Sequence, residues 1–175
     1  MNNETIILKC METLRNVLYR TRKHIPCFHD LCVTKSNEID IYYLHCKTKQ
    51  RMKAIYRDQF SIEDIKAHPK GTIFVTETWT KTMLQKIDSL LDKYEFFRLD
   101  ELYVNPCHFN ISYRLIRASE DDYINLQKEF LNQYPREYFP LVLKSDIIVK
   151  LLGGKPGDLI ETRRKDTYLY WRLIV

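Results

Sequence analysis

Four side chains that can bind a metal ion lie within nine residues near the N-terminus of the chain: His24, Cys27, His29 and Cys32. Imidazole and thiolate groups are the usual ligands of structural zinc. Such sites pair two short ligand-bearing segments across a longer loop, whereas one compact stretch rarely closes a tetrahedron. Free cysteines are also among the most buried residue types. The sequence therefore favours ordinary packing here, and it predicts neither a metal site nor a cofactor.

A second pattern is compatible with metal-dependent cleavage of nucleic acid. Asp64-Ile65-Lys66 matches the acidic-x-lysine element of nucleases, and Asp40 is a candidate for the other carboxylate. That chemistry requires carboxylates on adjacent strand ends that share a magnesium ion. Ser61, however, is a typical N-cap, so Asp64 is expected on a short helix. A stand-alone nuclease-like α/β protein with an Asp-based metal site stays open as the alternative function.

A third candidate is the glycine-rich segment 153–157, which holds three of the four glycines in the chain. A Walker-type phosphate loop needs Ser or Thr directly after Gly-Lys, and a helix that begins at the loop. Here Pro156 follows Lys155, and Asp158 would place negative charge where a phosphate should bind. These residues exclude a phosphate-binding loop.

The same segment has the signals of a structural turn. Ser145-Asp146 and the apolar residues after it predict a helix that ends at Gly153, where positive φ is common. Pro156-Gly157 suits the central pair of a type II turn, because proline fixes φ and glycine accepts positive φ. The segment is therefore predicted to end a helix and to turn the chain into a small β-rich module.

Composition bounds the class of protein. The chain lacks Gly-x-Ser-x-Gly, His-Glu-x-x-His and CxxC motifs, so we predict no catalytic residue. Its 175 residues are 45% hydrophobic, which is enough for a core, and the net charge of +5 permits a nucleic-acid partner. No apolar run is long enough for a membrane helix, and the N-terminus is not a signal peptide. Five cysteines without regular spacing fit a reducing compartment, which predicts an intracellular protein without membrane contact.

Hydrophobic periodicity predicts an α+β or α/β fold with a mixed sheet and flanking helices. Tyr134-Pro135 and Phe139-Pro140 favour extended chain, so the boundary between a larger N-terminal domain (1–135) and a small β-rich domain (136–175) is expected there. The predicted helices are 4–23, 61–68, 80–94, 119–132 and one after Asp146, and the predicted strands are 38–45, 52–57, 72–76, 102–104 and 167–175.

The C-terminal motifs occur in a specific order: Phe139-Pro140, Asp146–Val149, Gly153–Asp158, Arg164 and Trp171–Ile174. In this order and spacing the chain resembles the assembly domain of the fifth common subunit, which the eukaryotic nuclear RNA polymerases I, II and III share and which has an archaeal equivalent. That family has Leu-Pro, then Asp-Pro-Val, Gly-x-Lys-(Arg/Pro)-Gly-(Gln/Asp), a strand ending in Arg, and a terminal Tyr-Arg-Leu-Val.

The middle of the chain extends the resemblance. Thr72–Val75, an amphipathic helix and Glu101–Asn105 look like the end of the family's N-terminal jaw domain. The proline after Asp146 is absent, the loop after Arg164 is reduced to Lys165-Asp166, and the jaw is short. These departures suggest a divergent and virus-encoded member of the family.

The resemblance implies a non-catalytic subunit of a multisubunit DNA-dependent RNA polymerase, with the largest subunit and other polymerase subunits as partners. It implies a nuclear location for a cellular protein, and the host cytoplasm or virion for a viral one. On the terminal strand, Tyr168, Tyr170 and Arg172 are either partner anchors or packing for the jaw domain. The residues expected to bind a partner are Pro140, Asp146, Lys155, Gly157, Arg164, Tyr170 and Arg172.

The resemblance also implies that the jaw lies beside downstream duplex DNA. Four cations are predicted at a hairpin turn between two strands: Lys47, Lys49, Arg51 and Lys53. Such a turn can neutralise phosphates without reading bases, which gives weak and salt-sensitive contact. The alternative is a solvated turn whose charges prevent aggregation of a sheet edge.

Overall fold

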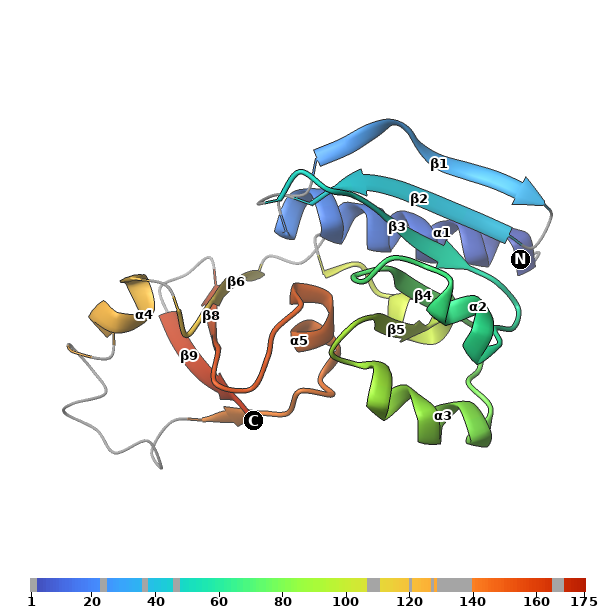
Figure 1. The fold of residues 1–175 in the computed structure, drawn as a ribbon. Helices are drawn as coiled ribbons and strands as arrows, with labels where there is room; N and C mark the ends of the chain where they lie inside the picture. Colours follow the sequence, from blue (N-terminus) through green and yellow to red (C-terminus); the bar gives the residue numbers. More distant parts are fainter. Residues whose placement is uncertain are drawn as a thin grey trace. The chain divides into compact units, whose positions relative to one another are not determined.

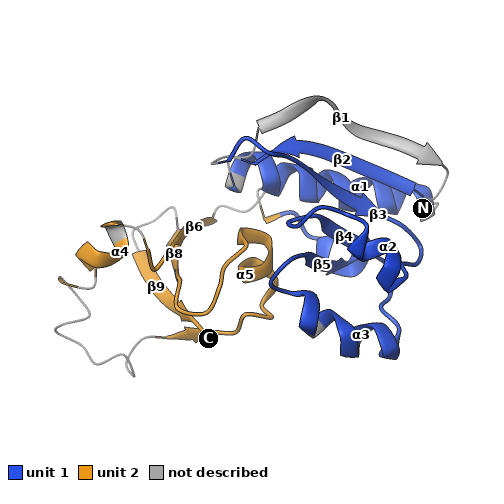
Figure 2. Cartoon of the chain, in the orientation of Figure 1, with its two compact units in different colours: residues 1–105 blue, residues 106–175 orange. Residues whose placement is uncertain are grey.

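A computed structural model describes residues 3–22, 25–35, 38–45, 48–106, 111–119, 121–126, 128, 140–164 and 169–175. It confirms the predicted mixed α+β class, with one five-stranded and one four-stranded sheet (Figure 1). The chain divides into two compact units, residues 1–105 and 106–175 (Figure 2). The predicted domain boundary falls in the segment 129–139, which lies outside the described residues.

Unit 1 is built on a mixed sheet with the strand order β1-β2-β3-β4-β5. The first three strands pair antiparallel, and β3, β4 and β5 pair parallel. The parallel strands follow from the β-α-β succession of the sequence, because each parallel step needs a crossover. The strands are β1 (Ile25–Lys35), β2 (Glu38–Leu44), β3 (Arg51–Tyr56), β4 (Ile73–Thr76) and β5 (Glu95–Arg98).

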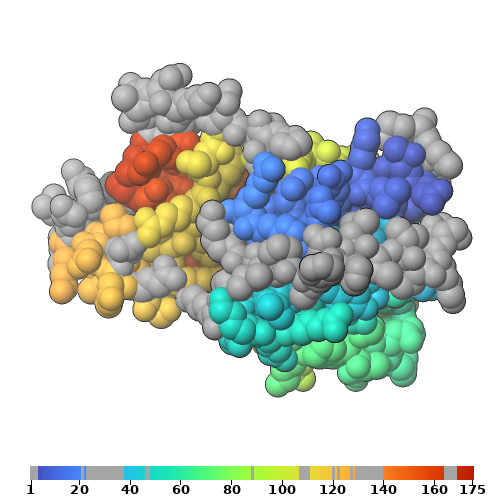
Figure 3. Space-filling model, turned by 90° about the horizontal axis from the view of Figure 1, so that it is seen from above, coloured from blue at the N-terminus to red at the C-terminus, as the bar shows by residue number. Residues whose placement is uncertain are grey.

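Helices supply the two crossovers and the core of unit 1. The crossovers are α2 (Ile62–Lys66) and α3 (Lys81–Ile87), which continues into the short 3-10 turn η2 (Asp88–Leu90). They pack on one side of β3, β4 and β5, where Phe74 is fully buried among Ile55, Ile65 and Phe96. In the space-filling view, turquoise atoms from the segment between β2 and α2 lie on the surface of this unit (Figure 3).

The N-terminal helix α1 (Asn3–Asn16) ends in a π-helical turn, η1 (Val17–Thr21), and contacts β2. The backbone N–H of Arg22 donates to the carbonyl of Val17 at 2.9 Å, which is the wide spacing of a π-turn. The Arg22 guanidinium donates to both carboxylate oxygens of Glu95, at 2.9 and 2.7 Å. Burial alone would lower the pKa of Arg22, but the Glu95 carboxylate raises it. The Arg22 side chain is only 8% exposed, so this cation at the end of the helix is buried in an ion pair.

The predicted strand 102–104 is wrong. The strand in this part of the chain is β5, which begins seven residues before the predicted one. It is followed by the 3-10 turn η3 (Leu99–Leu102). The backbone N–H of Arg98 donates to Glu101 Oε2 at 2.8 Å, which caps this turn. Leu99 and Leu102 are buried three residues apart, the spacing of a 3-10 helix instead of the alternation of a strand.

Unit 2 contains a four-stranded sheet with the order β6-β8-β9-β7. Its predicted helix after Asp146 is confirmed as α5, and α4 covers part of the helix predicted from residue 119. α5 packs with Val149 and Leu152 against one side of the sheet, and α4 packs with Tyr123 against the other. The elements are β6 (Ile111–Ile116), α4 (Asp121–Leu126), β7 (Leu141–Val142), α5 (Ile147–Leu152), β8 (Leu159–Arg164) and β9 (Leu169–Ile174).

Candidate functional site

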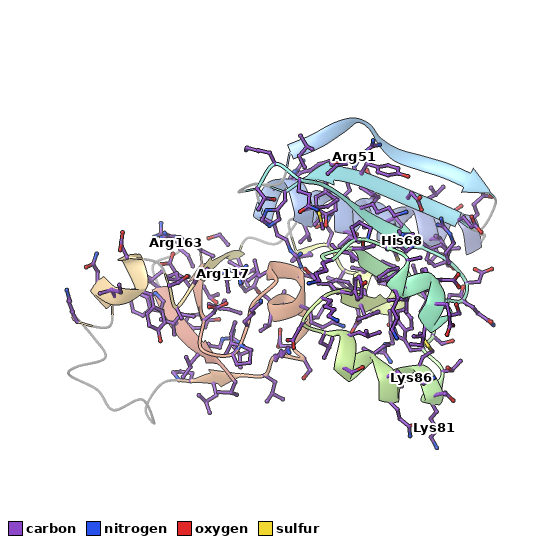
Figure 4. The ribbon with its side chains drawn as sticks, viewed as in Figure 1. Arg51, His68, Lys81, Lys86, Arg117 and Arg163 are labelled. Carbon is purple, nitrogen blue, oxygen red and sulfur yellow. The ribbon has the colours of Figure 1, made fainter. Side chains whose placement is uncertain are left out.

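The glycine-rich turn of unit 2 folds around a carboxylate of its own chain. Asp158 is buried, and its carboxylate accepts hydrogen bonds from the backbone N–H groups of Ala118 and Lys155, both at 3.0 Å. The Arg117 guanidinium donates to Asp158 Oδ2 at 3.2 Å and to the carbonyl of Gly153 at 2.9 Å (Figure 4). The Asp158 carboxylate therefore occupies the position at these backbone N–H groups where a phosphate would otherwise bind. Asp158 and Arg117 were absent from the predicted site residues.

The helix and turn around this carboxylate have the predicted geometry. Asp146 is the N-cap of α5, since its Oδ1 accepts from the backbone N–H of Ile148 at 2.8 Å. Gly153 ends the helix with φ 68°. The N–H of Asp158 donates to the carbonyl of Lys155 at 3.0 Å, and Gly157 has φ 93° at the third position of the turn. These values confirm the helix end and the turn with positive φ at glycine.

The other predicted partner-binding residues lie on or next to three strands of the same sheet. Pro140 is exposed at the start of β7, and its carbonyl accepts from the N–H of Leu173 at 3.0 Å. Arg164 ends β8, where only its backbone is described. On β9, Arg172 Nη2 donates to the hydroxyl of Tyr170 at 3.1 Å, and the guanidinium lies 5.2 Å from the centre of that ring. Tyr170 and Arg172 are half-buried and contact each other.

The predicted basic hairpin is confirmed in unit 1, because β2 and β3 pair antiparallel across the turn 45–50. The N–H of His45 donates to the carbonyl of Gln50, and the N–H of Lys49 donates to the carbonyl of His45, both at 2.9 Å. The N–H of Thr48 donates to Nδ1 of His45 at 3.3 Å. Lys49 is exposed and has φ 56°, a backbone conformation that is unfavourable for most residues other than glycine and asparagine. A lysine at this position of the turn therefore destabilises the backbone relative to a glycine.

Three of the four predicted DNA-proximal cations can be placed. Arg51 is exposed at the start of β3, and its guanidinium lies 4.6 Å from the centre of the Tyr42 ring (Figure 4). Lys53 is half-buried two residues later and lies opposite Tyr42 in the register. Since residues two apart share a face of a strand, Arg51 and Lys53 point to the same side of the sheet. Lys47 lies outside the described residues.

The carboxylates of the nuclease hypothesis have structural roles. Asp40 is buried in β2, and its Oδ1 accepts from Arg57 Nη1 at 2.8 Å. Asp64 forms a capping box with Ser61, whose hydrogen bonds are the main cause of its lowered pKa. Among the described residues, no group of three or more His, Cys, Asp or Glu side chains could hold a metal ion. The side chains of the zinc hypothesis, His24, Cys27, His29 and Cys32, lie outside the described part of the chain.

A histidine lies in the charged surroundings of the hairpin strands. Burial, and next the positive charge of Lys53, lower the pKa of His68 from 6.5, while Asp40 acts in the opposite direction. The His68 ring also packs 5.6 Å from that of Phe74, and its carbonyl accepts from the Tyr94 hydroxyl at 3.1 Å. The face of β2 and β3 next to α2 therefore carries mixed charge instead of a purely basic patch.

None of the helices in the described residues is both long and apolar enough to span a membrane. No protein-family model matches the chain. Its similarity to a known protein points to the subunits of DNA-directed RNA polymerases. That protein is DNA-directed RNA polymerase subunit Rpo5 of Pyrococcus abyssi (strain GE5 / Orsay), with 48% identity over 40 residues. This match supports the resemblance to the family of the fifth common polymerase subunit.

The match is partial for both proteins. It covers 21% of this chain and 49% of subunit Rpo5, so this chain is aligned with about half the length of that relative. Because the same segment is a larger share of the relative, subunit Rpo5 is less than half as long as this chain. Subunit Rpo5 is therefore too short to contain counterparts of both units of this chain.

Proposed function

We propose that this chain is a non-catalytic subunit of a multisubunit DNA-directed RNA polymerase. The observation that carries the proposal is the 48% identity over 40 residues to a polymerase subunit. The ordered motifs of the C-terminal segment support it, because they fold into one connected unit: a helix capped by Asp146, a turn closed by Asp158, and a terminal strand, β9.

Unit 2 is the part that we assign to polymerase assembly, with the largest subunit as its partner. The carboxylates of Asp146 and Asp158 and the N–H of Gly157 form hydrogen bonds within the unit. We therefore assign them to the stability of the unit, and not to direct contact with the partner. Lys155 keeps its side chain exposed on the turn and is the predicted partner residue that is best placed for a charged contact. A nuclear location, or a cytoplasmic or virion location for a viral protein, follows from the same proposal.

Unit 1 supplies the proposed contact with downstream duplex DNA. Lys49 and Arg51 are exposed on the β2–β3 hairpin, and Lys53 follows on the same side as Arg51. Lysine and arginine side chains on such a turn neutralise duplex phosphates at low salt, without base recognition. The contact is expected to be weak in the isolated chain and to matter only within the assembled enzyme.

The assembly proposal is tested by affinity purification of the tagged full-length chain from its native source. The two large catalytic polymerase subunits are expected among the co-purifying proteins. Recovery of the chain without any polymerase subunit would refute the proposal. Magnesium-dependent DNA cleavage by the purified chain, lost on Asp40→Ala or Asp64→Ala, would instead establish the nuclease alternative.

The DNA proposal is tested by reversing the charges of the hairpin. Lys47, Lys49, Arg51 and Lys53 are replaced together by glutamate, and the stability of elongation complexes is measured across a salt series. Each cation that meets a phosphate should contribute about one unit to the salt slope. The matched control is Lys81→Glu with Lys86→Glu, which changes two exposed cations on α3 (Figure 4). Equal slopes for the hairpin variant and the unmodified enzyme would leave the turn a role in solubility only.

A further inference from the structure

The register of the sheet in unit 2 assigns its side chains to two faces. Leu173 of β9 lies opposite Leu159 of β8 and opposite Leu141 of β7, so these three side chains share one face. It is the face on which α4 packs, since Leu159 and Leu173 contact the core around Tyr123. The next residues along the strands, Val142 and Ile174, belong to the opposite face with α5.

Helix α4 covers only part of its face. The face is closed around Leu159 of β8 and Ile116 of β6, whose side chains are 2% and 1% exposed. Near β9 and β7 four apolar side chains, which we name the leucine strip, remain open in the described structure. They are Leu141 (59% exposed), Leu143 (63%), Leu169 (39%) and Val175 (45%). Half-buried Trp171 and Leu173 lie between Leu169 and Val175 on the same face, so apolar side chains continue along it. Continuous exposed apolar surface, in contrast to single side chains, is typical of interaction surfaces.

A cation lies at each end of the leucine strip. Arg163 is opposite Leu169 in the register, and its side chain is 65% exposed although it lies 3.8 Å from Glu161. At the other end, exposed Lys144 donates its backbone N–H to the carbonyl of Val175 at 2.8 Å. Since β9 has six residues and a strand rises about 3.3 Å per residue, the two ends are about 20 Å apart.

The strip also borders an open strand edge. Among the described strands, β7 is the last of the sheet and pairs with β9 alone (Figure 1). The carbonyls of Pro140 and Val142 accept from the N–H groups of Leu173 and Val175, at 3.0 and 2.9 Å. Backbone groups alternate in direction along a strand, so those of Leu141 point away from β9. An extended segment can therefore pair with β7 while its side chains lie on the strip.

We propose that the leucine strip, with Lys144 and Arg163 at its ends, is the surface that docks on the largest polymerase subunit. The occupant is an extended apolar segment of that subunit with an acidic residue near each end, which pairs with β7 by strand addition. The inference rests on the proposed function, and it selects the face opposite to Tyr170 and Arg172. Those two share the α5 face, since Arg172 lies opposite Ile160 of the α5 core.

The experiment uses the tagged full-length chain co-expressed with the largest polymerase subunit from the same source. Leu141→Ser with Leu143→Ser should reduce recovery of that subunit about tenfold or more, because a few apolar anchors dominate such interfaces. Lys144→Glu with Arg163→Glu should also reduce recovery, and 0.5 M salt should weaken the unmodified complex. The matched control is Leu84→Ser with Leu91→Ser, two exposed leucines of unit 1. It should recover the subunit fully.

The outcomes separate this inference from the proposed function. If the unmodified chain recovers no polymerase subunit, both are overturned. If the unmodified chain and the leucine variant recover the subunit equally, the strip is overturned while the proposed function stands. A free chain that is dimeric, and monomeric in the leucine variant, would assign the strip to a second copy and overturn the inference. A fall in Tm of the free leucine variant by more than about 5 °C would do the same, by showing that the chain itself covers the strip.

Discussion

The two turns that carry the candidate sites use their polar groups in opposite ways. In unit 2, the turn around Lys155 directs a carboxylate inward, where Asp158 accepts from two backbone N–H groups and from Arg117. In unit 1, the hairpin turn closes with backbone bonds between His45 and Gln50 and leaves Lys49 exposed to solvent. The first turn connects distant parts of its unit, whereas the second presents charge.

The positive φ angles sharpen this difference. In unit 2 they fall on Gly153 and Gly157, which adopt such angles without strain. In unit 1 one falls on Lys49, for which the same conformation is disfavoured by about 1 kcal/mol. A turn with a structural role thus has the residue that suits its backbone, while the hairpin retains a cation against its backbone preference. This pattern is expected where the side chain has a function outside the chain.

The largest effect is expected from removing the buried carboxylate. Asp158→Ala leaves the backbone N–H groups of Ala118 and Lys155 and the half-buried Arg117 guanidinium without this acceptor, so it should lower the free energy of unfolding by about 3 kcal/mol. Urea denaturation of the full-length chain measures the loss. The control Asp121→Ala removes an exposed carboxylate of the same unit and should cost below about 1 kcal/mol. If the two variants lose equal free energy of unfolding, the buried Asp158 carboxylate does not stabilise the turn.

A smaller loss is expected from Gly157→Val. A Cβ at this position would meet no heavy atom within 4 Å, so the cost arises only from the backbone at φ 93°. A β-branched residue there should lower the free energy of unfolding by about 1–2 kcal/mol. Thermal unfolding should show a lower Tm, with Gly157→Ala between the valine variant and the unmodified chain. An unchanged Tm would mean that the turn changes conformation at no cost.

The hairpin should respond in the opposite direction. Lys49→Gly removes the strained side chain and should raise the free energy of unfolding by about 0.5–1 kcal/mol. The same variant should weaken salt-dependent stability of elongation complexes if Lys49 meets a phosphate. Gln50→Gly, at the neighbouring position, is the control and should not stabilise the chain. Stabilisation of the isolated chain without any change in elongation complexes would remove Lys49 from the DNA proposal.

The smallest effect is a pH dependence confined to unit 1. The pKa of His68 is lowered by burial and by Lys53, so the unfolded chain takes up the proton before the folded chain does. The stability contributed by neutral His68 is therefore present above about pH 6.5 and is lost as the pH falls below that value. His68→Gln should flatten the fall of Tm between pH 7.5 and 5.5. A Tm profile that His68→Gln leaves unaltered would show that His68 is not the titrating group.

Local signals predicted the local parts of both turns. Asp146, Gly153 and Pro156-Gly157 are sufficient to end a helix and form a turn, because capping and positive φ depend on a few adjacent residues. The β2–β3 hairpin followed from alternation around a polar segment. Ser61 likewise predicted the capped helix on which Asp64 lies.

Contacts between distant residues could not be predicted in the same way. The partner of Asp158 is Arg117, 41 residues away, and the partner of Arg22 is Glu95, 73 residues away. Neither pair produces a periodic pattern in the sequence. A basic helix end has the same sequence whether its arginine is solvated or buried. β1 was missed for a related reason: its pairing with β2 is irregular between Pro26 and Leu31, which obscures the alternation.

The ion pair between Arg22 and Glu95 has a consequence for how the protein is made. It joins the end of the first helix to the last strand of unit 1, and α1 also contacts η3. The ribosome must therefore add 73 further residues after Arg22 before its partner exists, which takes about 4–15 s at ordinary synthesis rates. During that interval Met11, Leu14 and Leu18, fully buried in the finished fold, have no completed sheet to cover them. Nascent chains stalled before residue 95 should consequently bind chaperones, and those stalled well beyond residue 105 should not.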